Sequence, residues 1–455
     1  MATMSTKSSA SVQTSGVVAG SYGPALTVLT TLFFIWGSLT SLNDVLIPFA
    51  QHVFTLNLAQ SMLIQTAFFL AYFIISLPAA KIIDWIGYKR AIIVGLSTMV
   101  AACLLVYPAA KIPSFPFFLT ALMVLAAGIT VLQVAANPYV AVLGRPQTAS
   151  SRLNLTQAFN SLGTAVFPFV GARLILGETV SAAAQSASQD AVIKLYVYFF
   201  AIVLVLLAIL FAVFKLPKME SAERHAGEKV NDSIWKHPNL PFGAIAIFVY
   251  VGAEVAIGSS IANYLALPNI GHFASGVADP AARYHSALAV AARYISIYWL
   301  GAMVGRFIGS AVLQKVKTSR VLAFCATMAA LLVVVTVLSN GHFAMWSVLS
   351  IGLFNSIMFP SIFTSGIAEL GPLTGDGSGL LNMAIVGGAI IPWVVGRIGD
   401  AINHSWYPSM IQGETSWGQG IHFALILAAF CYLYILFYAV SGSKPNSERY
   451  GQRVL

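Results

Sequence analysis

The chain has 455 residues, of which 58% are hydrophobic and only 9% are charged. A typical soluble domain has about 25% charged residues, so a soluble fold could not place this much apolar surface, and a soluble enzyme is excluded. The net charge of +9 is expected in the loops of a membrane protein and does not indicate a nucleic-acid partner. The three cysteines lie in apolar runs, without the spacing of a disulfide framework or a metal site.

Twelve apolar runs are long enough to cross a bilayer, for which a helix needs about 20 residues. The predicted spans are 24–51, 58–82, 90–110, 115–143, 152–176, 193–216, 241–267, 291–314, 320–339, 342–370, 377–399 and 420–440. The longest charged interruption falls between the sixth and the seventh. We therefore predict an all-α polytopic membrane protein with 12 transmembrane helices in two pseudo-symmetric six-helix bundles. The expected parts are a disordered tail (1–22), an N-terminal bundle (23–216), a linker (217–240), a C-terminal bundle (241–440) and a second tail (441–455).

The distribution of basic residues predicts the orientation. Most of the 24 Lys and Arg fall in the two tails and in the loops that follow even-numbered spans. Because cytoplasmic loops are enriched in Lys and Arg, we expect the linker and both termini on the cytoplasmic side. The two halves also resemble each other weakly, as in secondary transporters, whose binding site lies between the repeats near the middle of the bilayer.

Two carboxylates lie deep inside predicted spans, where an ionised side chain costs about 2.5–3.5 kcal/mol on insertion scales. Asp44 lies in the first span, within WGSLTSLNDVLIP (36–48), and Glu254 lies in the seventh, within YVGAEVAIGSS (250–260). The first span of each bundle thus carries one buried acid, which predicts a proton or cation site. For Glu254 an alternative stays open, a fixed ion pair with Arg306 of the eighth span.

Amide side chains predict a second kind of site. On spans four and five, amides and hydroxyls recur at i, i+3 and i+7, so that each set lies on one helical face. Amides both donate and accept hydrogen bonds, which suits a neutral ligand rich in hydroxyls; the alternative is that they only bond helices to each other. The two sets are Thr130, Gln133 and Asn137, and Gln157, Asn160 and Thr164. The candidate substrate-binding residues are Asn43, Gln133, Asn137, Gln157, Asn160, Asn355, Asn382 and Trp393, the last two on nearly the same face of span eleven.

The segment DWIGYKR (84–90) follows span two and has the pattern Asp-x-x-Gly-x-basic-basic. It predicts a salt-bridged conformational latch, formed by Asp84, Gly87, Lys89 and Arg90, that differs between inward-open and outward-open states. The alternative is a tight turn with ordinary cytoplasmic charges.

Four longer strings resemble one known family. SLNDVLIPFAQ (41–51), LQVAANPYVAVLG (132–144), SRLNLTQAFNSLGT (151–164) and YVGAEVAIGS (250–259) are similar to the fucose:proton symporter family of the major facilitator superfamily. Within that family the chain looks closest to the glucose/galactose permease branch. The resemblance runs from about residue 25 to residue 440.

The resemblance implies roles for individual residues. Asp44 matches the aspartate that takes part in proton coupling, and Gln157 and Asn160 match amides that contact the sugar. Two positions depart from the fucose symporter, which has a glutamate at Gln133 and an amide at Glu254. Some glucose/galactose members use sodium, so the coupling ion stays open between a proton and sodium.

Together these patterns predict a transporter of the bacterial inner membrane, with no enzymatic activity, that imports a neutral monosaccharide together with a cation. Glucose or galactose is the expected sugar; the alternatives are an N-acetylglucosamine or fucose-like permease and, less favoured, a metabolite or drug exporter. We expect no cofactor or metal beyond a coupling H⁺ or Na⁺, and a monomer whose partners are the sugar and the lipid bilayer.

Overall fold

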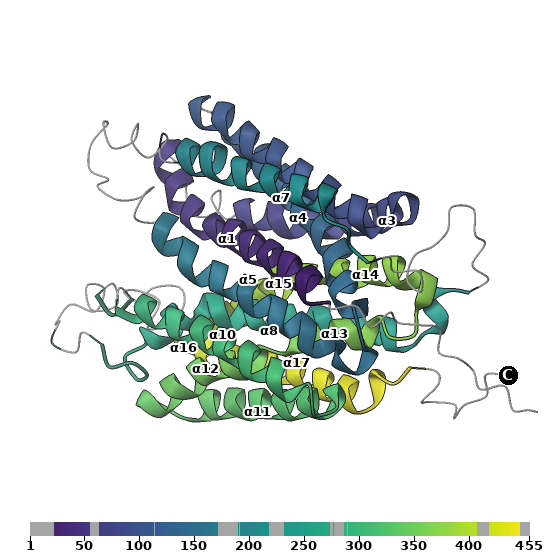
Figure 1. Cartoon of the computed structure of the whole chain (residues 1–455). Coiled ribbons are helices and arrows are strands. Elements are labelled where there is room, and N and C mark those ends of the chain that lie inside the picture. Colours follow the sequence, from purple (N-terminus) through teal and green to yellow (C-terminus); the bar gives the residue numbers. More distant parts are fainter. Residues whose placement is uncertain are drawn as a thin grey trace, which may run out of the picture.

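The structure is a computed structural model. It describes residues 22–54, 63–112, 114–171, 190, 192–217, 232–273, 276, 286–288, 290–406 and 418–445. The predicted N-terminal tail, most of the predicted linker and most of the C-terminal tail lie outside these residues. Nearly all of the described backbone is helical (Figure 1), and it contains ten helical stretches long and apolar enough to cross a membrane.

The N-terminal half corresponds to the six spans predicted for it. Its second and third spans form the continuous α3, interrupted only at Gly87, whose backbone (φ 75°, ψ 166°) is not helical. A glycine is favoured there because a side chain disfavours positive φ. The fifth span, α5, is not among the ten apolar stretches because its amides lower its hydropathy. The helices are α1 (Gly23–Phe54), α3 (Leu63–Lys111), α4 (Phe115–Val142), α5 (Ala149–Gly171) and α7 (Ala201–Val213), which continues the π-helix η3 (Lys194–Phe200).

The C-terminal half contains the other six predicted spans, of which the last three are each divided into shorter helices. A 3₁₀ turn, η7 (Ala384–Val386), separates the two parts of span eleven. The helices are α8 (Asn239–Leu265), α10 (Ile295–Val312), α11 (Thr318–Leu338), α12 (Gly341–Asn355), α13 (Met358–Gly366), α14 (Thr374–Met383), α15 (Gly387–Trp406), α16 (Gly418–Ala424) and α17 (Ile426–Phe437). The predicted twelve-span, all-α fold is therefore confirmed.

Glycines allow the helices of each half to approach closely. A Cβ added to Gly163 of α5 would lie 2.4 Å from the carbonyl oxygen of Phe34 in α1. A Cβ added to Gly305 of α10 would lie 2.4 Å from the carbonyl oxygen of Leu353 in α12. Small residues at helix contacts are the usual means of packing in membranes, where lipid supplies no hydrophobic drive for helices to associate.

The outer surface is apolar. On α7 the exposed side chains Ile202, Leu206, Ile209 and Val213 recur every three to four residues, so they form one stripe along the helix. An exposed aliphatic stripe of this length is unfavourable in water and fits a surface that faces lipid. The chain is thus a multi-pass membrane protein.

The two halves lie one above the other in Figure 1, with α1, α3, α4 and α7 on one side and α10, α11, α12 and α17 on the other. The helix α14 belongs to the C-terminal half but lies against α3 and α4 of the N-terminal half. We call the end of the molecule at which α7 ends and α8 begins the linker end. Near it lie the last turns of α4, α10 and α13 and the first turns of α5, α11 and α14.

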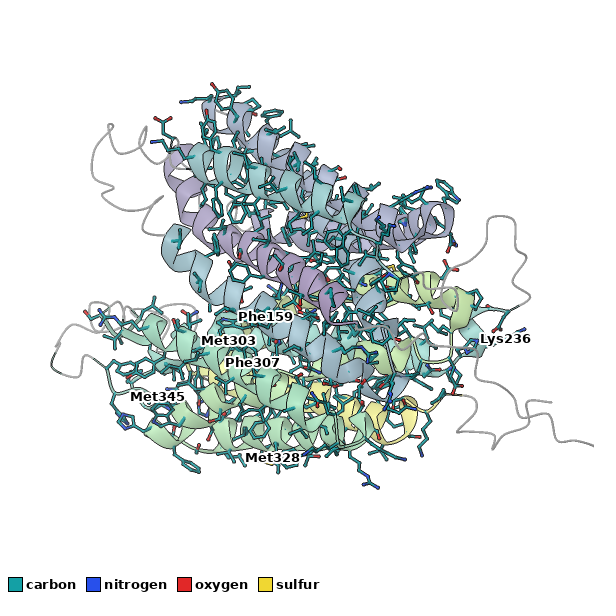
Figure 2. The ribbon with its side chains drawn as sticks, viewed as in Figure 1. Phe159, Lys236, Met303, Phe307, Met328 and Met345 are labelled. Atoms are coloured by element: carbon teal, nitrogen blue, oxygen red, sulfur yellow. The ribbon has the colours of Figure 1, made fainter. Side chains whose placement is uncertain are left out.

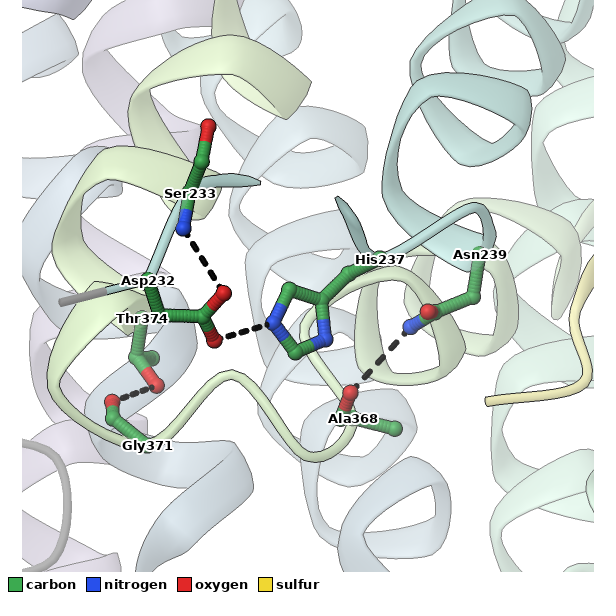
Figure 3. A network of polar contacts seen from close by, with 7 residues as sticks. All are labelled: Asp232, Ser233, His237, Asn239, Ala368, Gly371 and Thr374. Carbon is green, nitrogen blue, oxygen red and sulfur yellow. Dashed lines mark hydrogen bonds and ion pairs between the residues drawn. The ribbon is translucent and has the colours of Figure 1, made fainter. Parts of the chain in front are cut away.

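The described part of the linker is bound to the C-terminal half (Figure 3). Asn239, the first residue of α8, donates from Nδ2 to the carbonyl oxygens of Ser365, Gly366 and Ala368 at 3.0–3.1 Å. The start of α8 thereby fixes the turn between α13 and α14.

A second linker contact joins Asp232 and His237. Asp232 accepts hydrogen bonds from His237 Nε2 and from the backbone N–H of Ser233, both at 2.7 Å. These bonds stabilise the ionised carboxylate, so they hold the pKa of Asp232 below its ordinary value of 3.8.

Candidate functional site

Glu254 lies in the middle of α8, where it is partly buried beside a tyrosine of its own helix. Tyr250, one turn earlier, donates a hydrogen bond from its hydroxyl to Glu254 Oε1 at 2.7 Å. Residues at i and i+4 share one face of a helix, so the local sequence itself brings this pair together. Glu254 also interacts electrostatically with Arg306 of α10. Within the described part of the chain, however, the two side chains form no ion pair.

Arg306 connects the two halves. Its Nε donates to the carbonyl oxygen of Ser356 at 3.2 Å, within its own half. Its Nη1 donates to the carbonyl oxygen of Gln157 at 3.2 Å and to the hydroxyl of Ser161, both on α5 of the other half. All three acceptors are uncharged. The fixed ion pair considered from the sequence is therefore absent, and the guanidinium instead holds α10 on the amide-bearing face of α5.

A further polar contact of the C-terminal half lies near Glu254. Asn355 Nδ2 donates to the hydroxyl of Tyr298 at 2.8 Å, and the side chains of both residues are fully buried. Tyr298 interacts electrostatically with Glu254 and Arg306. The amide oxygen of Asn355 is buried without a hydrogen-bond partner among the described residues. An unsatisfied buried acceptor is costly, so this atom is a candidate for a ligand or a water.

The amides of α4 and α5 divide into two groups. Gln133 donates from Nε2 to the hydroxyl of Tyr72 in α3, and Asn160 donates from Nδ2 to the carbonyl oxygen of Phe33 in α1 at 3.0 Å. These two side chains bond helices to each other, as the alternative interpretation expects. Asn137 differs, because both of its amide atoms are buried and lack partners among the described residues. Gln157 is 5% exposed, and its backbone is bound by Arg306.

The two residues predicted on span eleven differ in their surroundings. Asn382 of α14 is fully buried, and its Nδ2 donates to the carbonyl oxygen of Ser378 at 2.8 Å. Its Oδ1 is buried without a partner in the described structure. Trp393 of α15 is 67% exposed. The two therefore do not share an environment, because the 3₁₀ turn at Ala384–Val386 changes the helical phase between them.

The segment predicted as a latch contains Gly87, the non-helical residue of α3, and its charged residues have different surroundings. Asp84 lies 3.5 Å from Lys81 Nζ, and Lys81 in turn forms an ion pair at 2.7 Å with Asp376 of α14 in the other half. Lys89 donates to the carbonyl oxygen of Ala212 at 3.0 Å, within its own half. Arg90 is exposed. One contact between the halves is thus made by Lys81 and Asp376, which the motif did not identify.

The backbone of Asn43 and Asp44 lies in α1. The side chains of these two residues lie outside the described part of the structure. Asp44 remains a prediction from sequence.

Hydrogen bonds between the halves are concentrated toward the linker end. On one side α5 contacts α10, α11 and α13 through buried hydroxyls, a set of contacts that we call the hydroxyl interface. Ser151 donates to the carbonyl oxygen of Ser310 at 2.6 Å, and Ser310 donates back to that of Ser151 at 3.0 Å. Ser150 bonds to Thr364 at 2.6 Å and to Thr318 at 3.0 Å. Deeper along the same helices, the rings of Phe159 and Phe307 lie 5.8 Å apart (Figure 2).

On the other side α3 and α4 contact α14, a set of contacts that we call the ion-pair interface. It contains the Lys81–Asp376 pair and a hydrogen bond at 2.8 Å from the hydroxyl of Ser378 to the carbonyl oxygen of Val134. Gly379 lies against α3, since a Cβ there would be 2.9 Å from Ala80 Cβ. Single serines and one lysine carry no pattern that would have identified these pairs from the sequence.

Among the described residues, no group of three or more His, Cys, Asp or Glu side chains could hold a metal ion. Around Glu254 and Arg306, the described interior offers a carboxylate, a guanidinium, tyrosine hydroxyls and amides. These groups can bind a cation and a polyhydroxylated neutral molecule.

The sequence is similar to known transporters. It matches the family described as Major Facilitator Superfamily over residues 27–392. It is 49% identical over 423 residues to a glucose/galactose transporter of Brucella abortus, covering 93% of this chain and 95% of the relative. It is 33% identical to the L-fucose-proton symporter of Escherichia coli, over 84% of this chain and 88% of the relative. A crystal structure of FucP in the outward conformation superposes with a TM-score of 0.78 at 30% identity, covering 93% of this chain and 100% of that chain.

Proposed function

Because this chain belongs to the major facilitator superfamily, and within it to the group of the glucose/galactose transporters and fucose:proton symporters, we propose that it is a symporter importing glucose or galactose with a cation. The observation that carries the proposal is the 49% identity to a glucose/galactose transporter over nearly the whole of both chains. The pattern of buried polar groups supports it, since they occur on the helices that connect the halves.

We assign the cation to Asp44 and Glu254. Glu254 is placed in the interior beside Tyr250 and within electrostatic reach of Arg306. Neutralising the carboxylate of Asp44 lowers the cost of enclosing it in a low-dielectric interior, so the loaded carrier reorients more readily than the empty, charged one. The coupling ion is a proton or sodium. The fucose relative is a proton symporter, which favours the proton as the coupling ion. Compared with the fucose symporter, this chain has no carboxylate at position 133 and has one at position 254, so we also test sodium.

We assign the sugar hydroxyls to amides whose atoms are still free to bond. Asn137, Asn355 and Asn382 each have a buried amide oxygen without a partner in the described structure, and this supports them over amides already bonded to helices. Gln157 joins them because Arg306 fixes its backbone. The remaining candidates are Asn43, Gln133 and Asn160, together with Trp393 on the exposed face of α15.

The transport cycle that we propose is alternating access in the bacterial inner membrane by a monomer with both termini in the cytoplasm. The linker end would then face the cytoplasm, in agreement with the basic residues of its loops. Since the halves are hydrogen-bonded there, the described conformation would be the outward-open one. The likeness to FucP in its outward conformation supports this assignment.

The test is uptake of labelled glucose into proteoliposomes under an imposed sodium gradient and, separately, under an imposed proton gradient. Unlabelled galactose, N-acetylglucosamine and fucose compete in each. We expect accumulation under one of the two gradients and competition by galactose. If glucose does not accumulate under either gradient and only N-acetylglucosamine or fucose competes for binding, the assigned sugar is wrong.

The variant Asp44→Asn separates binding from coupling. It should bind and exchange sugar without accumulating it, because exchange does not require the empty carrier to reorient. Accumulation equal to that of the parent would exclude Asp44 from coupling.

A further inference from the structure

Arg306 lies between the two halves with only uncharged acceptors around its guanidinium. These are the carbonyl oxygens of Ser356 and Gln157 and the hydroxyl of Ser161. Among the described residues, the ion pairs do not include Arg306. Arg306 is partly buried, and a cation in such a place without a direct counter-ion depends on charges at longer range for part of its compensation.

Glu254 supplies that longer-range charge. It interacts electrostatically with Arg306, and Tyr250 holds its carboxylate in place by a hydrogen bond of 2.7 Å. Tyr298, the other group that interacts with both, is neutral. With Glu254 ionised, the net charge of the Glu254–Arg306 pair is zero. With Glu254 neutralised by a proton or a bound cation, it is +1.

We propose that Arg306 is a positioning residue through which cation binding at Glu254 opens the linker end. The inference deepens the proposed function and rests on it for the identity of the cation site. When Glu254 is neutral, the partly buried Arg306 loses its nearby negative charge, and enclosing an uncompensated charge is unfavourable. The guanidinium then gains by leaving the Gln157 carbonyl for water. Since this contact joins α10 to α5, its loss weakens the attachment of the two halves.

The direction of this effect is the one that symport requires. A carrier hydrogen-bonded at the linker end becomes easier to open there once its cation is loaded. The same guanidinium holds the backbone of Gln157, so the helix that carries candidate sugar ligands is connected to the cation site by one side chain. The Lys81–Asp376 pair could not act in this way, because Lys81 is 55% exposed and water compensates its charge.

The experiment measures opening of the linker end directly. Spin labels are placed on the full chain in lipid nanodiscs at Trp85 and Gln314, which are exposed and belong to opposite halves. Cys103, Cys325 and Cys431 are buried, and single-label samples control for their reaction. Distances are measured by pulsed electron paramagnetic resonance without sugar. We expect Glu254→Gln to raise the fraction of long distances, because it leaves Arg306 uncompensated.

Variants of Arg306 then show whether its charge transmits the effect. In an Arg306→Gln background, which keeps amide donors but loses the charge, Glu254→Gln should add no further opening. In an Arg306→Lys background, which keeps the charge without the planar fork, Glu254→Gln should still increase opening. In an Asp376→Asn background, which weakens the other interface, it should add its full effect.

The inference is overturned if Glu254→Gln opens the linker end equally with and without the charge of Arg306, or does not open it at all. Uptake of labelled glucose by the parent separates this result from failure of the proposed function. If a cation gradient drives glucose uptake but opening of the linker end does not depend on Arg306, this inference is wrong and the proposed function stands. If opening of the linker end depends on Arg306 but the protein transports neither glucose nor galactose, the inference is supported and the assigned sugar is wrong.

Discussion

The hydroxyl interface of α5 with α10, α11 and α13 buries its polar contacts, whereas the ion-pair interface of α3 and α4 with α14 leaves its charges partly exposed. Ser151 and Ser310 are about 95% buried and exchange reciprocal hydrogen bonds. In the ion-pair interface, Lys81 is 55% and Asp376 19% exposed. Both interfaces join the two halves at the linker end, but one does so with buried hydrogen bonds and the other with a partly exposed ion pair.

The difference shows what each interface contributes. Buried hydroxyl–carbonyl bonds depend on short distances, act only at close contact and are little affected by salt. An exposed ion pair attracts at longer range but contributes little net free energy, so the closeness of α14 to α3 must come from packing at Gly379. We therefore expect the ion-pair interface to be sensitive to volume at Gly379 and nearly insensitive to its charges.

The largest effect is expected from Gly379→Ala in the ion-pair interface. The added Cβ would lie 2.9 Å from Ala80 Cβ and 3.0 Å from the carbonyl oxygen of Ser76. Neither atom can move without the backbone of α3, so α14 must withdraw. Overpacking of this kind costs about 1–3 kcal/mol, which is roughly a 5- to 150-fold shift toward an open linker end. The spin-label distance between Trp85 and Gln314 measures the shift.

Gly375→Ala is the matched control for this substitution. It lies one turn earlier on α14, and its added Cβ would meet its nearest atom, Asp84 Oδ1, at an ordinary 3.5 Å. Both changes replace a glycine of the same helix by alanine, so their difference chiefly reports the contact of position 379 with α3. Equal distance distributions for the two variants would show that packing at Gly379 does not hold this interface.

The next largest effect is expected in the hydroxyl interface from the double variant Ser151→Ala and Ser310→Ala. It removes both reciprocal bonds, each worth about 0.5–1.5 kcal/mol, and leaves two buried carbonyl oxygens with fewer donors. The linker end should open more often by roughly 5- to 100-fold, and the shift should not change with salt. The same labels measure it.

Thr327→Ala is the control for loss of a hydroxyl. Among the described residues, the hydroxyl of Thr327 bonds to the carbonyl oxygen of Ala323 in its own helix alone, and its side chain is exposed. It should leave the distances unchanged. If it opens the linker end as much as the double variant does, then the reciprocal bonds are not what holds the hydroxyl interface.

The parts of these interfaces that could be predicted from sequence are the local ones. Most spans follow from hydropathy, which sums over each segment, and the Tyr250–Glu254 contact follows from a spacing of four residues on one helix. The pairing of Ser151 with Ser310 depends on which faces of α5 and α10 meet, and neither sequence segment contains that information.

Two departures have a similar origin. The phase of span eleven changes at a 3₁₀ turn, so Asn382 and Trp393 occupy different environments although their spacing suggested one face. Arg306 was considered only as a partner of Glu254, because a helical pattern within one half does not reveal a carbonyl acceptor in the other. Contacts between the halves are therefore the least predictable part of the site.

A smaller effect is expected from Asp376→Asn, which removes the ion pair at 2.7 Å with Lys81. Exposed pairs contribute about 0–1 kcal/mol, so opening should increase by no more than about fivefold. The remaining effect should disappear near 1 M salt, where the screening length is about 3 Å. A salt-independent effect as large as that of the double serine variant would remove the distinction between the two interfaces.

The smallest effect is expected from Asp232→Asn in the linker. The hydrogen bonds of Asp232 in the described structure are to the neighbouring residues His237 and Ser233, so this variant is a reference for the two interfaces. The variant loses the carboxylate that accepts from His237 and Ser233, and local amide exchange in residues 232–240 should become about two- to fivefold faster at neutral pH. Because these bonds lower the pKa of Asp232, its contribution is present above the ordinary value of 3.8 and is lost as the pH falls through the lower folded value. The parent and the variant should therefore exchange alike at sufficiently low pH, while the label distances between the halves are the same in both at neutral pH. A change in those distances on Asp232→Asn would mean that the linker, and not only the two interfaces, holds the halves together.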